Sequence, residues 1–147
     1  MEKVITLKNG ALAALATLGT LLSKAFGGWD IALQLLIGAM ALDYLTGLIV
    51  AAVFKKSKKS KSGALSSNAG FRGLLKKGGI LLVVLVAAML DRLLDVSFVR
   101  TAAATFFVAN EALSILENAG MMGVPMPKFL PKMLEALRDK ADDGELE

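Results

Sequence analysis

The chain has 147 residues, of which 55% are hydrophobic and only 20% are charged, and its formal net charge is +4. Soluble domains average about 45–50% apolar and about 25% charged residues. Without cysteine or histidine, the chain cannot form disulfides, thiolate nucleophiles, the usual zinc sites or histidine acid–base catalysts. These absences argue against an enzyme, and we expect no catalytic residue, no metal and no cofactor.

The first apolar run predicts a membrane-spanning helix over residues 4–26. A crossing needs roughly 20 mostly apolar residues. The core of this run, residues 10–22, is shorter than that. The run spans if Lys8 and Lys24 extend their charged ends to the membrane surface. The same residues also fit a cleaved secretory signal, because Lys3 and Lys8 precede an apolar stretch.

The second run, residues 29–54, is the clearest span. Trp29 and Phe54 stand at its two ends, and an interfacial position suits Trp29. Its only ionisable residues are Asp30, at the start, and Asp43, near the middle. An aspartate at the centre of a span costs roughly 2.5–3.5 kcal/mol on insertion scales. We therefore expect Asp43 to face protein or water.

Small residues share the helix face of Asp43. The positions recur every four residues, and Thr46 lies next to them; the set is Ala39, Asp43, Gly47 and Ala51. Such stripes allow helices to approach closely. Two interpretations stay open: Asp43 pairs or caps within one chain, or these residues line a helix contact or a water-filled lesion in an oligomer.

A basic connection follows over residues 55–77. It carries eight cations and no acid: Lys55, Lys56, Lys58, Lys59, Lys61, Arg72, Lys76 and Lys77. The positive-inside rule places it on the cytoplasmic membrane surface, where it can contact anionic lipids. Nucleic-acid binding is the alternative interpretation of this connection. It is less favoured because Phe71 is the only aromatic residue among residues 55–77 that could stack on a base. Within this connection, residues 62–68 predict a turn, and one of Ser66, Ser67 and Asn68 is expected to cap a short interfacial helix.

Two more spans are predicted after the basic connection. Residues 78–98 form the third and carry Asp91, Arg92 and Asp95 near their end. Residues 100–118 form a weaker fourth span that contains Asn110 and Glu111, which we expect to line a lumen or a subunit contact. Four spans would place both termini in the cytoplasm.

The C-terminal segment, residues 124–147, predicts a cytoplasmic tail. It holds all three prolines, and Pro131 suits the first position of a short helix. An acidic end follows, with Asp142, Asp143, Glu145 and Glu147. The tail is either a solvated end or a gating or partner segment.

The fold class predicted from these runs is all-α: an integral membrane helical protein with about four transmembrane helices, three being possible, a short C-terminal helix and an acidic tail. The alternative for each run is a buried helix of a soluble protein, since short apolar runs are ambiguous.

Several short motifs occur in a fixed order. Residues 42–47 read Leu-Asp-Tyr-Leu-Thr-Gly; a lysine cluster, Ser66-Ser67 and Gly70-Phe71-Arg72-Gly73 follow; Asn110-Glu111 and Pro127-Lys128 come later. This order resembles the toxin-secretion/phage-lysis holin family over about residues 29–140.

The resemblance implies a small multipass protein of the bacterial host's cytoplasmic membrane. Such a protein oligomerises and permeabilises the bilayer, so that endolysin or other cargo escapes. The implied partners are the lipid bilayer, including anionic lipids, other copies of the chain and, indirectly, the cargo; no nucleic acid is expected. The competing functions are a small multispan transporter or channel and a membrane adaptor.

Overall fold

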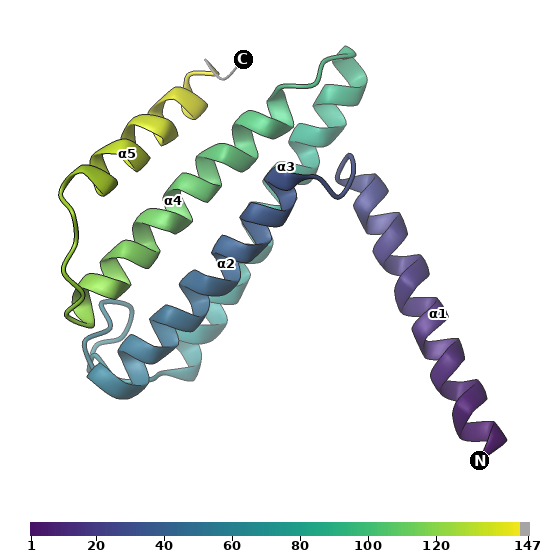
Figure 1. The fold of residues 1–147 in the computed structure, drawn as a ribbon, viewed down its shortest axis with the longest axis horizontal. Helices are drawn as coiled ribbons and strands as arrows, with labels where there is room; N and C mark the ends of the chain where they lie inside the picture. The colour runs from purple at the N-terminus through teal and green to yellow at the C-terminus, as the bar shows by residue number, and fades with distance from the viewer. Residues whose placement is uncertain (145–147) are drawn as a thin grey trace. The chain divides into compact units, whose positions relative to one another are not determined.

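The structure is a computed structural model that describes residues 1–144. Figure 1 shows that these residues form helices and contain no strand. The helices are α1 (Glu2–Ala25), α2 (Ile31–Ile49), a π-helical extension of α2 called η1 (Val50–Phe54), α3 (Ser67–Leu94), α4 (Val99–Met121) and α5 (Phe129–Asp142). The predicted all-α fold class is confirmed.

Helix α1 belongs to a compact unit of its own, Met1–Asp30. It buries none of its residues. The hydroxyls of Thr6, Thr17 and Thr20 donate hydrogen bonds to backbone carbonyls four residues earlier in the helix. These bonds satisfy polar groups that would otherwise be costly among lipid tails.

The second unit is a bundle in which α4 is the central helix. Helix α4 packs against α2, α3 and α5, and its most extensive contact is with α2. Alanines allow these close approaches, because Ala102, Ala104 and Ala109 are all buried on α4. The opposing apolar core comes from α2, η1 and α3: Leu33, Leu36, Met40, Val50, Ile80 and Val84.

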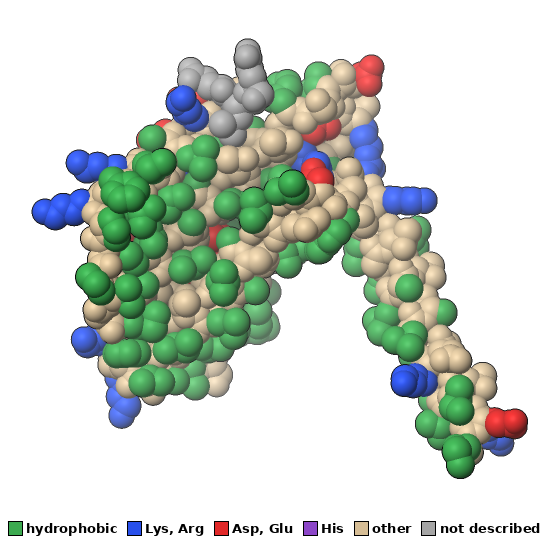
Figure 2. Space-filling model, viewed as in Figure 1, with side chains coloured by type: hydrophobic (Ala, Val, Ile, Leu, Met, Phe, Trp, Pro, Cys, Tyr) green, Lys and Arg blue, Asp and Glu red, His purple; other side chains and the backbone are tan. Residues whose placement is uncertain are grey.

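The outer surface of both units is strongly apolar. Figure 2 shows hydrophobic side chains spread over the visible face. On α3, for example, Leu82 is 64% exposed and Leu93 is 79% exposed. Soluble monomers rarely expose large continuous apolar patches, and most side chains of these helices are not buried. The interpretation as buried helices of a soluble protein is therefore not supported.

Three helices are long and apolar enough to cross a membrane, among the residues that the structure describes: α1, the continuous segment Ile31–Phe54 and α3. The chain is thus an integral membrane helical protein. Helix α4 has 23 residues but does not belong to this group, so a fourth crossing stays a prediction.

Helix α3 begins earlier than the predicted span of residues 78–98. It starts at Ser67, where Ser66 Oγ accepts a hydrogen bond from Ala69 N at 3.5 Å. Ser66 is therefore the capping residue among the three candidates. The expected interfacial helix forms the first turns of α3, because Gly78 and Gly79 do not interrupt the helix; two glycines cost only about 1 kcal/mol each.

The connection from α3 to α4 is held by Asp91. Its Oδ1 accepts from Val99 N at 2.9 Å and its Oδ2 accepts from Arg100 N at 3.1 Å. Both donors belong to the first turn of α4, where backbone N–H groups lack partners within the helix. Asp91 therefore fixes the point at which the chain reverses direction.

Helix α5 lies alongside α4 (Figure 1). It begins at Phe129, so Pro131 is its third residue and not its first. A proline is tolerated at either position, because the N–H groups of the first turn have no acceptor within the helix and proline lacks only that N–H. The predicted acids Glu145 and Glu147 lie outside the described residues.

Candidate functional site

Each of the three main bundle helices contributes one buried charged side chain to a common cluster. These are Asp43 on α2, Lys77 on α3 and Glu111 on α4, with exposed fractions of 4%, 9% and 4%. Lys77 Nζ donates to Asp43 Oδ2 at 2.9 Å and also donates to Glu111 Oε2 in a short contact. We call these three residues the ion cluster.

Asn118 on α4 is a further partner of Asp43. Its Nδ2 donates to Asp43 Oδ1 at 3.2 Å and to Thr46 Oγ1 at 2.9 Å. Thr46 in turn donates its hydroxyl to the carbonyl of Leu42 at 2.8 Å. A Cβ at Gly47 would lie 3.8 Å from Asn118 Nδ2, so the glycine lets α4 approach α2 at this level.

The ion cluster holds two acids and one cation, and an exposed lysine supplies the second positive charge. Lys77 serves both carboxylates, and Lys59 from the basic connection brings Nζ to 3.7 Å from Asp43 Oδ2. Two cations therefore face two acids. Among the described residues, no buried side-chain nitrogen or oxygen lacks a hydrogen-bond partner. A buried charge without a partner costs several kcal/mol, and this arrangement avoids that cost within a single chain.

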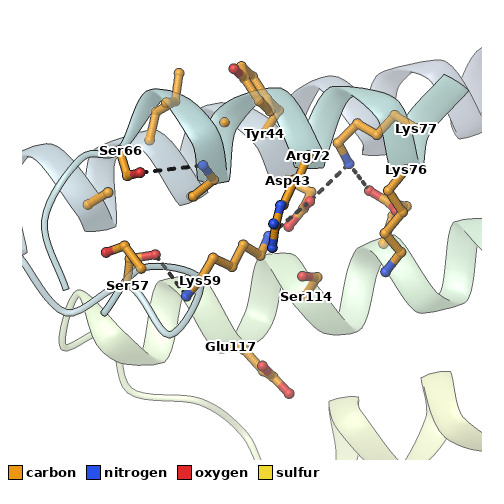
Figure 3. A pocket seen from close by; sticks show the side chains of 18 of the residues that line it. Asp43, Tyr44, Ser57, Lys59, Ser66, Arg72, Lys76, Lys77, Ser114 and Glu117 are labelled. Atoms are coloured by element: carbon orange, nitrogen blue, oxygen red, sulfur yellow. Dashed lines mark hydrogen bonds and ion pairs between the residues drawn. The ribbon is translucent and has the colours of Figure 1, made fainter. Parts of the chain in front are cut away.

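A cavity of about 560 Å³ adjoins the cluster. Its walls come from α2, the basic connection, α3, α4 and α5 (Figure 3). Arg72 and Lys76 project into it from α3, and Ser114 and Glu117 lie on the α4 side. The cavity therefore connects the buried ion cluster with the end of the bundle that carries the basic connection.

The predicted residues of α2 and η1 contribute to contacts inside the chain. Asp43 and Ala51 are buried, and Gly47 is half-buried where α2 meets Asn118 of α4. Ala39 is also half-buried. Asp43 thus pairs within one chain in this structure, which is the first of the two interpretations left open by the sequence.

The two polar residues predicted on α4 have different positions. Glu111 belongs to the ion cluster, whereas Asn110 is half-buried and lines the cavity. Neither is shown to line a lumen, so that role stays a prediction.

Seven of the eight predicted surface cations are exposed: Lys55, Lys56, Lys58, Lys59, Lys61, Arg72 and Lys76. Lys77 differs, because it is buried between two carboxylates. Its place in the sequence groups it with the basic connection, since the apolar run begins at residue 78. The structure instead places Lys77 well inside α3, on the face that packs in the bundle.

The helix bounds explain why these three residues meet. Asp43 lies eleven residues before Phe54, Lys77 lies ten residues after Ser67, and Glu111 lies ten residues before Met121. At about 1.5 Å per residue, neighbouring antiparallel helices bring these positions to a similar level, about 15 Å from one end. The level of Lys77 follows only when α3 is known to start at Ser67 and the three helices are known to pack together.

Comparison with known proteins agrees with the motif order. The profile of the bacteriophage holin family matches residues 20–139. A Clostridium perfringens protein, named an uncharacterized 14.9 kDa protein in the nagH 3′ region, is 48% identical, covering 95% of this chain and 99% of the relative.

Two further relatives extend the comparison. A Listeria innocua protein, named Lin0175, is 34% identical, covering 96% of this chain and 93% of the relative. The probable holin of Bacillus phage phi105 is 33% identical, covering 75% of this chain and 76% of its own length. No solved structure matches the chain significantly. Because the family profile covers most of the chain, this protein belongs to the bacteriophage holin family.

Proposed function

We propose that this protein is a phage-type holin that oligomerises in the host's cytoplasmic membrane and permeabilises it, releasing endolysin or other cargo at lysis. Family membership supports the general role. The observation that carries the detailed proposal is a charged cluster buried inside a bundle whose outer surface is apolar.

This arrangement lets a single chain reside in lipid. Asp43, Lys77 and Glu111 satisfy one another, while exposed leucines and valines contact lipid tails. When copies accumulate, helix–helix contacts between chains compete with contacts within one chain. Separation of α4 from α2 would then turn the polar residues towards water. A threshold in protein concentration follows without a catalytic step.

The proposed topology places the basic connection on the cytoplasmic side. Its seven exposed cations satisfy the positive-inside rule. With α1 crossing the membrane, the N-terminus also lies in the cytoplasm. With α4 crossing as well, a cytoplasmic C-terminus requires α5 to leave its position alongside α4 in the membrane. Protease added outside intact cells should then leave residues 55–61 uncut; cleavage there would overturn the topology.

The test of function is expression of the protein alone, with dye entry and membrane potential followed over time. Abrupt loss of both after a delay supports a holin. Selective flux without cell death would support a transporter or channel, and no permeability change would support an adaptor. Co-expressed endolysin should reach the medium only after the abrupt event.

The Asp43→Ala variant tests the role of the cluster in this process. It removes the acceptor shared by Lys77 and Asn118, so we expect altered timing of permeabilisation and a changed oligomer size. Asp139→Ala on α5 is a matched control, because it removes an exposed acid. Unchanged timing and oligomer size in Asp43→Ala would exclude Asp43 from the mechanism.

A further inference from the structure

The cavity opens beside cations that the ion cluster does not use. The three charges of the ion cluster and the exposed Lys59 balance one another. Arg72 and Lys76 lie one helical turn apart on α3 and line the same cavity. Neither makes a hydrogen bond or ion pair with any described residue.

The remaining charges at the cavity leave this pair uncompensated. Glu117 is engaged by Lys58 at 3.8 Å, and Arg138 is engaged by Asp139 at 3.1 Å. Glu135 on α5 is the one other acid in the cavity lining. Two cations and a single acid therefore remain at the opening, which favours a ligand that carries negative charge.

Two serine hydroxyls also line the cavity, one from the basic connection and one from the N-cap of α3. Ser57 Oγ and Ser66 Oγ each accept a hydrogen bond from a backbone N–H, at 3.2 Å and 3.5 Å. Each hydroxyl hydrogen is therefore available to a ligand oxygen. A guanidinium, an ammonium and hydroxyl donors together match a phosphate group, which offers several acceptor oxygens and is well suited to arginine.

Apolar side chains next to the opening indicate the source of the phosphate. Leu65 lines the cavity and is 61% exposed, and Phe71, which follows Gly70 of the lining in sequence without lining the cavity itself, is also 61% exposed. Free phosphate gains nothing from such neighbours, whereas a lipid places its acyl chains beside them. Glu135 can accept a hydrogen bond from a hydroxyl on the headgroup, as in a glycerol headgroup.

We propose that this cavity is a binding site for the phosphate of an anionic phospholipid in the inner leaflet, with Arg72 and Lys76 as the principal contacts and a hydroxyl-bearing headgroup preferred. The leaflet assignment rests on the topology of the proposed function. The site itself goes beyond diffuse attraction of the basic connection to anionic membranes, because it selects two of the seven exposed cations.

The full-length protein in neutral detergent allows a direct test. Short-chain phosphatidylglycerol, phosphatidic acid, phosphatidylcholine and inorganic phosphate are each titrated, with thermal stabilisation and native mass spectrometry as readouts. We expect one retained phosphatidylglycerol per chain, weaker binding of phosphatidic acid, and negligible binding of phosphatidylcholine and inorganic phosphate. Binding by inorganic phosphate equal to that of the lipids would overturn the lipid assignment.

Charge-matched variants locate the site. Arg72→Gln with Lys76→Gln removes two cations from the cavity, and we expect phosphatidylglycerol affinity to fall about 30-fold, at about 1 kcal/mol per cation. Lys55→Gln with Lys56→Gln removes two exposed cations that do not line the cavity and should change the affinity less than threefold. Equal losses in the two double variants would overturn the proposal in favour of diffuse attraction.

Failure of this site is distinguishable from failure of the proposed function. Lipid retention is measured on purified protein and needs no hole formation. A wild-type chain that permeabilises cells but retains no lipid refutes only the site, and a chain that retains lipid without permeabilising cells refutes only the holin function.

Discussion

Replacing Lys77 with methionine should be among the most destabilising single substitutions in the bundle. The methionine keeps much of the side-chain volume but leaves Asp43 and Glu111 buried, at 4% exposure each, without the ammonium group that separates them. Removing one partner of a buried ion pair costs about 3–5 kcal/mol. At about 2–4 °C per kcal/mol for a chain of this size, the midpoint of thermal unfolding should fall by about 6–20 °C.

The assay is thermal unfolding of the full-length protein in detergent, followed by circular dichroism. Lys76→Met is the matched control, because it removes the neighbouring cation from an exposed position and should shift stability by about 0.5 kcal/mol or less.

A neutral cluster provides the second comparison. Asp43→Asn, Lys77→Met and Glu111→Gln together remove all three charges, so most of the lost stability should return, since replacing a whole buried ion cluster is often nearly neutral. Similar unfolding midpoints for Lys77→Met and Lys76→Met would refute the assignment of Lys77 to the bundle interior.

Three further substitutions test the packing around the cluster by the same unfolding assay. Gly47→Leu should force α2 and α4 apart and cost about 1–3 kcal/mol, whereas Gly38→Leu, whose Cβ has no neighbour within 4 Å, should cost much less; equal effects would contradict the close approach. Asp91→Ala should cost about 1 kcal/mol through loss of the α4 cap, and Asp91→Asn should retain part of that; no change in either variant would contradict the capping role. Gly63→Ala should be destabilising because its φ is +72° and its Cβ would lie 2.2 Å from the carbonyl oxygen of Lys55; a wild-type midpoint would mean that the connection adopts another conformation.

The membrane character of the chain follows from composition and run length. Hydrophobic runs over residues 29–54 and 78–98 have few charges, and such runs need no knowledge of packing to be recognised, because the lipid acts on each helix separately. The order of short motifs along the chain likewise indicates the holin family without any knowledge of packing. Asp43 stands out as a charged residue in an otherwise apolar span, since its insertion cost requires a partner.

The identity of that partner depends on the tertiary structure. The sequence groups Lys77 with the surface cations because it borders a lysine-rich stretch. A count of charge along the chain cannot distinguish an exposed lysine from one whose side chain turns into a bundle. Only the packing of α2, α3 and α4 brings Asp43, Lys77 and Glu111 together across intervals of 34 residues. Local sequence determines which segments enter the lipid, whereas long-range packing determines which buried charges neutralise one another, because electrostatic pairing depends on distance in space and not on separation along the chain.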